Sequence, residues 1–411
     1  MATYLLTTVG TAGDVFPFIV LAGALQARGH KVGILANPYF EKRVRAAGVS
    51  FYPLGTEEAY REALAAPEIW KSRGLVRLLE SLLPPLRESY AQMVSHIDAS
   101  TVVLTHPFFF AARIARETLP NACVTLLPSP MLLRSNYETP VLYGSQNLNS
   151  MARPLKRLMW WMADHFYLDR IVGKKLNELR GEVGLETISR PFNGWLYSPD
   201  RTIGLFPDWF APPQPDWPGE LRLSGFPLFK CQEGLPDQVA RFLKAGSPPV
   251  VFTPSTGVMD VRRFREAAME CCQRLGVRGL FLAMLDDDGG SDDFLCARFA
   301  PLEEVLPESR ALVHSGGVGT AAAAIAAGIP QLVIPLAFDQ PDNAARIVRL
   351  GLGRRCSSRQ ARVAAMSASV AAILEDEAMR VRCVEFSSRI DRIATLNQIC
   401  ALVEEVERQE P

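Results

Sequence analysis

The stretch ALVHSGGVGTAAAAIAAGIPQLVIP, residues 311–335, decides the fold class of this chain. An apolar run ends at His314, a glycine-rich turn follows, and an alanine-rich segment leads into a second apolar run. This order of strand, turn, helix and strand is typical of a parallel sheet covered by helices. We therefore expect an α/β fold around this stretch.

The glycine-rich turn predicts a site for an anion. At the start of the expected helix, backbone amides lack helical partners, and the positive end of the helix dipole points outward. These amides belong to Gly317, Val318, Gly319 and Thr320. With the Thr320 hydroxyl and the His314 ring as further donors, they suit phosphate oxygens. The turn fits neither the dinucleotide-binding spacing of glycines nor the P-loop, and an ordinary strand-to-helix turn remains the alternative.

Polar residues follow the second apolar run, in LAFDQPDNAAR, residues 336–346. Asp339 and Gln340 would lie at the carboxyl end of a strand, where a carboxylate and an amide suit the hydroxyl groups of a sugar. Asp342 and Asn343 follow them, and all four side chains could instead cap the next helix.

The alternation of strands and helices extends over most of the chain. Apolar runs at residues 4–9 and 32–36 enclose an amphipathic segment, and further strands are expected at residues 101–105, 123–127 and 250–253. Strands that alternate with helices predict parallel sheets.

A proline-rich segment divides the chain. PDWFAPPQPDWP, residues 207–218, holds five prolines, which exclude a helix or a central strand. We place an interdomain linker there. The prediction is a first domain at residues 1–212, a second at residues 213–385, and a C-terminal helix at residues 386–411 that crosses back to the first. A ligand cleft is expected between the two domains, at the carboxyl ends of their strands.

Bulk properties narrow the function. Lys and Arg number 44, as do Asp and Glu, so no overall field attracts nucleic acid. The start MATYLLTTVG lacks the features of a signal peptide, and no apolar run reaches the roughly 18 residues of a membrane span. We expect a cytoplasmic protein. The eight cysteines have no metal-ligand spacing and are interpreted as buried thiols.

The first domain holds candidate site residues in three loops. The turn GTAGD after the opening strand ends at Asp14, whose carboxylate would face the cleft or cap a helix that begins near Phe16. His106 follows the strand TVVLT and would contact a ligand or cap a helix. An apolar pocket would be lined by Phe108, Phe109 and Pro128.

An aromatic helix is expected at residues 157–170, RLMWWMADHFYLDR. Leu158 and Trp161 share one face of it. The first interpretation is a core helix, and the alternatives are the wall of an apolar pocket or a surface that meets lipid. The role of the Trp160 and Trp161 pair stays open among these.

The turn HSGGVGT, followed by DQPDNA, resembles the donor signature of the family 1 glycosyltransferases, which have the GT-B fold. The opening VGTAGDVFPFIVLAGALQARGHKV, the segment VGLET, the SPD that begins at Ser198, LFPDWFAPPQPDWP and SGFPLF extend the likeness over nearly the whole chain. These segments are most similar to the rhamnosyltransferases of bacterial rhamnolipid synthesis. The resemblance implies two Rossmann-like parallel-sheet domains, with the acceptor in the first, a nucleotide sugar in the second, and no metal or other cofactor.

The resemblance also implies roles for single residues. The helix-start amides and His314 would hold the donor diphosphate, and Asp339 with Gln340 the sugar. Phe299 would lie against the base. Small hydroxyl residues near the phosphates would be Thr253, Ser255 and Thr256. Asp14 would remove the proton of the acceptor hydroxyl, beside an acceptor pocket formed by His106, Phe108, Phe109 and Pro128.

One departure from the family pattern bears on the donor. Relatives that use uridine donors often carry Glu eight residues after the His, where this chain has Ala322. Because that Glu accepts hydrogen bonds from ribose hydroxyls, its loss favours a deoxyribose donor. We expect transfer of rhamnose from dTDP-rhamnose to a hydroxyl of a hydrophobic, lipid-like acceptor, such as a 3-hydroxyalkanoyl compound.

Alternative functions remain open. One is UDP-glucose-dependent transfer to a hydrophobic metabolite, and another is a sugar-nucleotide epimerase of the same fold. A lipid-like acceptor also suggests weak association with a membrane surface, at the periphery of the inner membrane. Asp286-x-Asp288 resembles the metal motif of the other major glycosyltransferase fold, but its acidic, glycine-containing surroundings favour a solvated loop, so we expect no metal.

Overall fold

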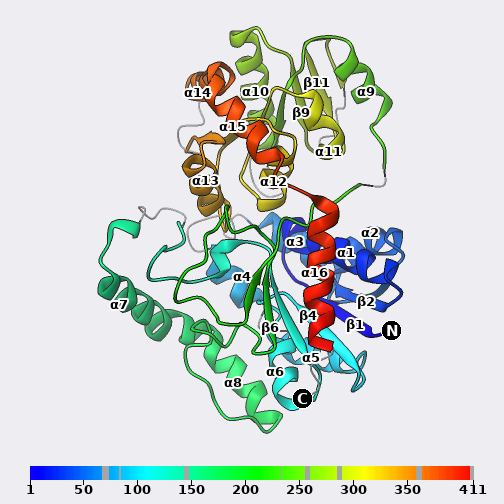
Figure 1. The fold of residues 1–411 in the computed structure, drawn as a ribbon, viewed down its shortest axis with the longest axis vertical. Coiled ribbons are helices and arrows are strands. Elements are labelled where there is room, and N and C mark those ends of the chain that lie inside the picture. The colour runs from blue at the N-terminus through cyan, green and yellow to red at the C-terminus, as the bar shows by residue number, and fades with distance from the viewer. Residues whose placement is uncertain are drawn as a thin grey trace. The chain divides into compact units, whose positions relative to one another are not determined.

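A computed structural model describes residues 1–66, 74–82, 85–142, 148–231, 233–254, 260–284, 289–357 and 363–407 (Figure 1). The chain forms two units. Unit 1 comprises Met1–Pro227 and Arg392–Pro411, and unit 2 comprises Leu228–Asp391. Each unit is built on one predominantly parallel sheet, which confirms the predicted fold class.

The sheet of unit 1 has seven parallel strands in the order β3-β2-β1-β4-β5-β6-β7. The strands are β1 (Thr3–Thr7), β2 (Lys31–Ala36), β3 (Ser50–Pro53), β4 (Thr101–Thr105), β5 (Cys123–Leu127), β6 (Arg201–Gly204) and β7 (Leu221–Leu223). The central strands β4 and β5 are buried along their whole length. Continuous burial is typical of parallel strands whose two faces are both covered.

Helices follow most strands of unit 1. They are α1 (Ala12–Ala27), α2 (Glu41–Ala46), α3 (Glu57–Ala65), α4 (Gly74–Leu82), α5 (Leu86–Val94), α6 (Phe110–Thr118), α7 (Arg153–Ala163), α8 (Lys174–Glu182) and α16 (Arg392–Glu407). Shorter turns are η1 (Pro38–Phe40), η3 (Pro130–Leu132) and η4 (Leu148–Ser150), and the π-helical η5 (Asp164–Gly173) joins α7 to α8. Helices α6 and α8 contribute Phe110, Ile114, Leu176 and Leu179 to one hydrophobic core cluster.

The sheet of unit 2 has the order β10-β11-β9-β8-β12-β13-β14, and only β10 is antiparallel to its neighbour. The strands are β8 (Val250–Thr253), β9 (Gly279–Leu282), β10 (Gly289–Gly290), β11 (Phe294–Ala297), β12 (Ala311–His314), β13 (Gln331–Val333) and β14 (Gly353–Arg355). The helices are α9 (Asp237–Lys244), α10 (Val261–Leu275), α11 (Leu302–Val305), η6 (Leu306–Glu308), α12 (Val318–Ala326), α13 (Gln340–Arg349), α14 (Val363–Glu375) and α15 (Glu377–Ser387).

Both sheets follow the strand order of the Rossmann fold. The first parallel strands, β1 to β3 in unit 1 and β8, β9 and β11 in unit 2, are added outward on one side, with β10 at the edge beyond β11, and the chain then returns to the centre and adds strands on the other side. The order reverses between β1 and β4 in unit 1, and between β8 and β12 in unit 2. Ligands of open α/β sheets bind beyond the carboxyl ends of the strands at such a reversal. The fold thus points to the loops that follow these four strands.

The segment at residues 207–218 is not the interdomain linker. It lies within unit 1, ahead of β7, and the unit continues to Pro227. Its Phe210 is fully buried and contacts Phe226, with ring centroids 5.2 Å apart. The prolines do exclude a helix, but the aromatic side chains between them pack into unit 1. The boundary therefore comes later than residue 212.

Helix α16 packs against α1 of unit 1 (Figure 1). Glu404 accepts hydrogen bonds from Arg28 Nε at 2.6 Å and Nη2 at 2.8 Å, and it lies 3.0 Å from His30 Nε2. These contacts, with that of Arg28 the largest, lower the pKa of Glu404 to about 2. At the other end of α16, Thr395 lies so close to Gly225 that a Cβ there would be 2.6 Å from its Oγ1.

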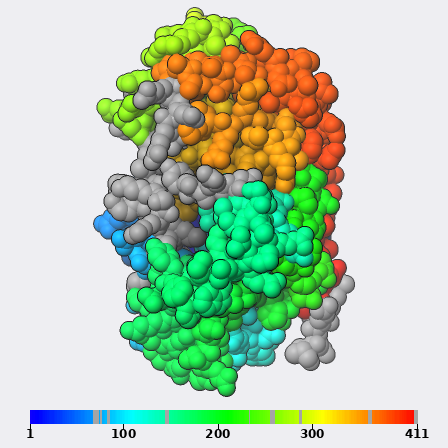
Figure 2. Space-filling model, turned by 90° about the vertical axis from the view of Figure 1, so that its left-hand side faces the viewer, coloured from blue at the N-terminus to red at the C-terminus, as the bar shows by residue number. Residues whose placement is uncertain are grey.

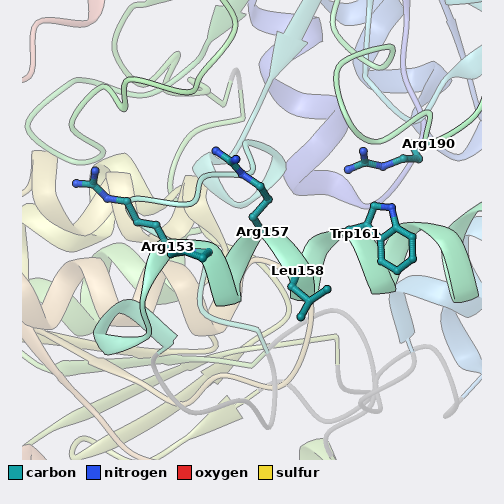
Figure 3. Close-up of a pocket in the computed structure, with 6 residues that line it drawn as sticks. Arg153, Arg157, Leu158, Trp161 and Arg190 are labelled. Carbon is teal, nitrogen blue, oxygen red and sulfur yellow. The ribbon is translucent and has the colours of Figure 1, made fainter.

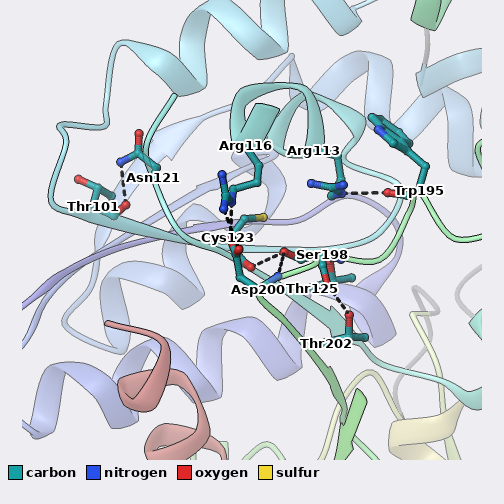
Figure 4. A network of polar contacts seen from close by, with 10 residues as sticks. All are labelled: Thr101, Arg113, Arg116, Asn121, Cys123, Thr125, Trp195, Ser198, Asp200 and Thr202. Carbon is teal, nitrogen blue, oxygen red and sulfur yellow. Dashed lines mark hydrogen bonds and ion pairs between the residues drawn. The ribbon is translucent and has the colours of Figure 1, made fainter. Parts of the chain in front are cut away.

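The SPD motif at Ser198 has a structural role, visible in the polar network of Figure 4. Asp200 accepts from Arg116 on α6 at 2.5 and 2.8 Å and from the Cys123 amide at 2.9 Å. Ser198 donates to the Cys123 carbonyl at 2.6 Å, while its amide donates to Thr125 Oγ1 at 2.9 Å. The motif therefore fastens the start of β6 to β5 and α6.

The helix expected at residues 157–170 is not a core helix. Leu158, Trp161 and Met162 are all exposed on α7. Its anchor is instead Lys156, which is buried and donates to the carbonyls of Tyr137 at 3.0 Å and Asn149 at 3.3 Å. Over the described residues, no helix of the chain combines the length and apolarity needed to cross a bilayer.

Candidate functional site

The first candidate site lies at the strand-order reversal of unit 1. Thr7 of β1 pairs with Thr105 of β4, and each strand is followed by a turn that carries a candidate residue. Asp14 lies in the first turn of α1, and His106 comes directly after β4. The structure brings these two predicted residues together, since Asp14 Oδ1 is 3.6 Å from His106 Nε2.

One oxygen of Asp14 caps α1. Its Oδ2 accepts from the Thr11 amide at 2.8 Å and from the Thr11 hydroxyl at 3.2 Å. Helix α1 begins at Ala12, four residues earlier than expected, which places Asp14 in the third helical position. The capping interpretation is thus correct, and it leaves Oδ1 for other contacts. Gly10 permits this arrangement, because a Cβ there would lie 2.4 Å from Asp14 Oδ2.

His106 is 2% exposed, yet one of its ring nitrogens has no hydrogen-bond partner. Its Nδ1 accepts from the Phe108 amide at 3.2 Å. In the neutral ring this acceptor role assigns the proton to Nε2. That N–H is directed at Asp14, whose side chain is 33% exposed, across 3.6 Å, which is too long for a hydrogen bond. A buried polar atom without a partner is uncommon and marks a site that a ligand can complete.

An aromatic group beside Asp14 was not predicted from the sequence. Tyr60 of α3 contacts Tyr39 and Phe40 edge-on or tilted, with ring centroids 5.2 and 5.5 Å apart. Phe16 contacts Phe40 at 6.3 Å. Burial, and then the negative charge of Asp14, raise the pKa of Tyr60. No local pattern indicates this group, because α3 lies some 45 residues beyond the Asp14 turn.

The expected acceptor pocket is only partly realised. Phe108 is half-buried and contacts His106, with ring centroids 5.4 Å apart. Phe109 instead belongs to the hydrophobic core of unit 1, with 3% exposure, so it does not form a pocket wall. Pro128 follows β5 and is buried. The three-residue apolar run therefore divides between the site and the core.

The second candidate site lies at the strand-order reversal of unit 2. His314 ends β12 and pairs with Thr253 at the end of β8. The His314 ring is buried and already bonded on both sides. Its Nε2 lies 3.0 Å from Gln331 Oε1, and its Nδ1 accepts from the Gly316 amide at 3.1 Å. Burial lowers the pKa of His314 to about 4. Because both ring nitrogens already have partners, the expected direct hydrogen bond from this ring to a diphosphate cannot form. His314 instead stabilises the turn through the Gly316 amide.

The start of α12 is open. The first helical bond runs from the Ala321 amide to the Gly317 carbonyl at 3.0 Å, so the preceding amides have no partner within the helix. Among the described residues, no side chain caps this end. A Cβ built at Gly317 or Gly319 would meet nothing within 4 Å, and Gly319 is exposed. Val318 and Thr320 complete the first turn, and the anion site predicted here stays a prediction.

A buried clamp fixes this turn. Asn343 of α13 donates to the Gly316 carbonyl at 2.9 Å and to Asp339 Oδ2 at 2.7 Å. Gly316 has a φ of 97°, which only glycine adopts easily. Its amide and carbonyl are thus held by His314 and Asn343 respectively. The sequence leaves open whether Asn343 contacts a ligand or caps a helix, and its buried position between two turns follows only from the fold.

The sugar-binding residues expected after β13 differ in accessibility. Asp339 is half-buried, while Gln340 is buried and its Oε1 accepts from the Leu336 and Ala337 amides at 2.8 and 3.2 Å. Phe338, between them and the strand, has a φ of 54°, a conformation that is strained for a non-glycine residue and clusters at functional sites.

The remaining candidates have these positions. Phe299 follows β11 and is 43% exposed, as a residue that stacks on a base must be. Thr253 is half-buried, whereas Ser255 and Thr256 lie outside the described residues, as do Asp286 and Asp288. Ala322 is buried within α12. In the described parts of the chain, no group of three or more His, Cys, Asp or Glu side chains could hold a metal ion.

Two family models match the chain, one in each unit. Residues 4–116 match the N-terminal domain of glycosyltransferase family 28. Residues 291–394 match the C-terminal domain of proteins like the erythromycin biosynthesis protein CIII. The first match covers the Asp14 and His106 turns, and the second covers the α12 start and its clamp.

Curated relatives align over most of the chain. O-mycaminosyltylonolide 6-deoxyallosyltransferase of Streptomyces fradiae is 28% identical, over 97% of this chain and 96% of its own length. Sterol 3-beta-glucosyltransferase UGT80B1 of Arabidopsis thaliana is 27% identical, over 84% of this chain and 58% of its own.

Solved structures share the fold over nearly the full length. The glycosyltransferase of kitacinnamycin has a TM-score of 0.76 at 18% identity, covering 98% of this chain and 99% of its own. VinC, solved with dTDP, has 0.70 at 17%, covering 99% and 100%. The spinosyn rhamnosyltransferase SpnG has 0.67 at 18%, covering 100% of both chains. The chain is thus similar in sequence to glycosyltransferases in both parts of its length, and it shares the fold of the solved glycosyltransferases over nearly its full length.

Proposed function

We propose that this enzyme transfers a 6-deoxy sugar, with rhamnose as the first candidate, from a dTDP-linked donor to a hydroxyl of a hydrophobic acceptor. A 3-hydroxyalkanoyl compound is the first acceptor to test. The reaction is a single displacement that inverts the anomeric carbon. The observation that carries the proposal is that unit 2 has a helix start, at α12, that no described side chain caps, and that unit 1 has a carboxylate, Asp14, with one oxygen outside its cap.

The donor diphosphate binds at the start of α12. Val318, Gly319 and Thr320 supply amides without helical partners, and the dipole of the nine-residue helix favours the negative charge. The glycines let phosphate oxygens approach the backbone closely. His314 and Asn343 act as positioning residues, because they hold Gly316 from both sides. As the bond to the sugar breaks, these same amides stabilise the charge that develops on the leaving dTDP.

Asp14 is the general base. As the acceptor oxygen bonds to the anomeric carbon, its proton passes to Asp14 Oδ1, and the electrons of the broken bond leave with dTDP. His106 Nε2 lies 3.6 Å from the same oxygen, and its unpartnered N–H is available to the acceptor. A carboxylate is a weak base towards an alcohol, so proton transfer is concerted with the attack.

The donor identity is supported by relatives and by one residue. VinC was solved with dTDP, SpnG is described as a rhamnosyltransferase, and the Streptomyces fradiae relative as a 6-deoxyallosyltransferase. Ala322, where uridine-dependent relatives often carry Glu, removes an acceptor for ribose hydroxyls. Asp339 and Gln340 then contact the sugar hydroxyls, and Phe299 stacks on the base.

A hydrophobic acceptor suits the aromatic side chains around Asp14. Phe108, Phe16, Tyr39 and Tyr60 are all at least partly exposed and lie near the Asp14 and His106 turns. Apolar surface of this kind binds alkyl chains or rings by removing them from water.

The direct test is incubation of the purified chain with dTDP-rhamnose and a 3-hydroxyalkanoyl acceptor, with dTDP release and the product mass as readouts. Rhamnosylated product with an inverted anomeric centre supports the proposal, and an excess of chelator should leave the rate unchanged. An absence of product with every dTDP-sugar and every hydrophobic alcohol would refute it.

Glucosyl transfer to a hydrophobic metabolite is the second candidate, because the sterol 3-beta-glucosyltransferase relative aligns with 84% of the chain. UDP-glucose in the same assay decides between the two donors. Incubation with donor alone tests the epimerase alternative, since an epimerase returns a nucleotide sugar of changed configuration whereas a transferase only hydrolyses its donor slowly.

A further inference from the structure

Helix α7 and η5 of unit 1 present an exposed apolar face. Six large apolar side chains between residues 155 and 167 are exposed, with values from 41% at Trp161 to 55% at Leu155. The six are Leu155, Leu158, Trp161, Met162, Phe166 and Tyr167. The surface of this segment, coloured in teal and green, faces the viewer in Figure 2. Soluble proteins rarely expose so many large apolar residues together, and such a patch marks an interaction surface.

The exposed charges on the same segment are basic. They belong to Arg153, Arg157 and Arg170. The acidic residues of this segment are directed inward. Asp164 is fully buried and paired with Arg134 and Arg190, and half-buried Asp169 accepts from the Arg190 amide at 2.9 Å. The face therefore offers only positive charge to a partner.

An open pocket of about 450 Å³ lies where the apolar and basic residues meet. Its lining consists of Arg153, Pro154, Arg157, Leu158, Trp161 and Arg190. Figure 3 shows the guanidinium groups of Arg153, Arg157 and Arg190 on the same side of α7, with Trp161 below Arg190. Guanidinium groups bind phosphate oxygens in a fork, while the apolar side chains beneath them suit acyl chains.

We infer that α7 and η5 dock the enzyme on a membrane surface that contains anionic phospholipid. Helices that lie in the interface combine an apolar face carrying Trp, Phe and Leu with Lys and Arg, as this one does. The long basic side chains extend to the headgroups while the apolar face enters the acyl boundary. The exposed charges on this helix are all positive, and an anionic membrane surface complements them along the whole helix. The surface of a folded protein carries charges of both signs and complements them less well. This inference does not depend on the identity of the donor or acceptor.

The test is co-sedimentation of the full chain with vesicles of phosphatidylcholine, either pure or mixed with phosphatidylglycerol, at low and high salt. The unaltered chain should bind the mixed vesicles, bind pure phosphatidylcholine weakly, and lose affinity as salt screens the charges. Arg153→Glu with Arg157→Glu should weaken binding by more than about tenfold, since each basic residue near the surface adds to the attraction. Leu158→Ser with Trp161→Ser should weaken it comparably and leave the residual binding more salt-sensitive.

Matched controls separate this face from general surface effects. Arg241→Glu with Lys244→Glu reverses two exposed charges on α9, and Val381→Ser with Val384→Ser removes two apolar side chains of α15 that are each 60% exposed. Both controls should bind vesicles like the unaltered chain, and circular dichroism should show every variant folded.

Three results would overturn the inference. One is an unaltered chain that does not bind mixed vesicles at low salt, and another is equal binding by the α7 variants and the controls. The third is a concentration-dependent dimer in sedimentation velocity that the α7 variants dissociate, without vesicle binding, because the face would then be an interface between two copies of the chain.

Discussion

The turns after β1 and after β12 have the same order of elements and opposite chemistry at the helix start. In unit 1, Thr11 precedes α1, and the third helical residue is Asp14, whose carboxylate accepts from the Thr11 amide at 2.8 Å. In unit 2, Gly317 precedes α12, the third helical residue is Thr320, and no side chain of the described residues caps the helix. One helix start is therefore occupied by an anion of the chain itself, and the other is open to an external anion.

This difference shows how one supersecondary unit serves two tasks. Both turns lie where the strand order reverses, so the fold offers two equivalent positions for a ligand. A carboxylate at the third helical position excludes phosphate from α1 and leaves an oxygen for proton transfer. Thr320 at the same position in α12 adds no charge, and the phosphate site remains. Under the proposed function, the side chain at this one position distinguishes the turn that carries the base from the turn that binds the donor.

The largest expected effect is that of Asp14→Asn. The amide oxygen can still accept from the Thr11 amide, so the capped turn should persist, but the side chain can no longer take a proton. We expect turnover to fall by roughly 10² to 10⁴, with donor affinity unchanged. Steady-state kinetics with saturating donor measures the loss, and a variant that keeps more than about a tenth of the activity would exclude Asp14 as the base.

The second effect is a pH dependence of the free energy of unfolding that arises from His314, before the α12 turn. Burial holds the pKa of His314 at about 4, below its ordinary 6.5, so the folded state favours the neutral ring. The contribution of the neutral His314 ring to the free energy of unfolding is fully present above about pH 6.5. It is lost as the pH falls towards about 4, and the loss amounts to up to about 3 kcal/mol. Urea unfolding across this range should show a shallower pH dependence in His314→Gln, which does not titrate. Equal slopes in the two chains would mean that His314 is not held neutral.

A third effect tests the comparison by making the two turns alike. Thr320→Asp places a carboxylate at the third position of α12, where α1 has Asp14. The helix should be as stable or more stable, because a negative charge in the first turn is favourable. The Michaelis constant for the donor should rise roughly ten- to a hundredfold, through repulsion and loss of the open amides. Thr320→Asn is the uncharged control, and a similar rise there would assign the effect to shape instead of charge.

The smallest effect is expected at the cap of α1. Thr11→Ala removes the hydroxyl that donates to Asp14 Oδ2 at 3.2 Å but keeps the carboxylate and the backbone amide. The free energy of unfolding should fall by about 1 kcal/mol, as for other lost caps. Turnover should stay within a few-fold of the unaltered chain. A loss as large as that of Asp14→Asn would show that Asp14 acts only through the stability of α1.

The arrangement of elements could be predicted from the sequence because it follows from local patterns. Strands expected at residues 101–105, 123–127 and 250–253 have these bounds in the structure. Apolar runs bounded by turns carry this information within a few residues of chain. The prediction of a linker at residues 207–218 was wrong because proline indicates only the local backbone conformation. The burial of Phe210 depends on contacts with residues elsewhere in unit 1.

The sequence predicts which turns form the candidate site, but it does not predict the contacts of individual side chains within them. The glycine spacing located the open start of α12, yet nothing in it showed that the His314 ring bonds to Gln331 and Gly316 instead of pointing outward. In unit 1, the sequence proposed Asp14 and His106 separately. Their proximity follows from the pairing of β1 with β4, which are about 95 residues apart in the chain. Contacts made across the sheet have no local signature.

The most direct test of the account is calorimetric titration of dTDP into the Asp14→Asn and Thr320→Asp chains in parallel with the unaltered chain. The account predicts an unchanged dissociation constant for Asp14→Asn and one raised roughly ten- to a hundredfold for Thr320→Asp. The reverse result, weakened binding in Asp14→Asn with normal binding in Thr320→Asp, would contradict the assignment of the donor to the open start of α12.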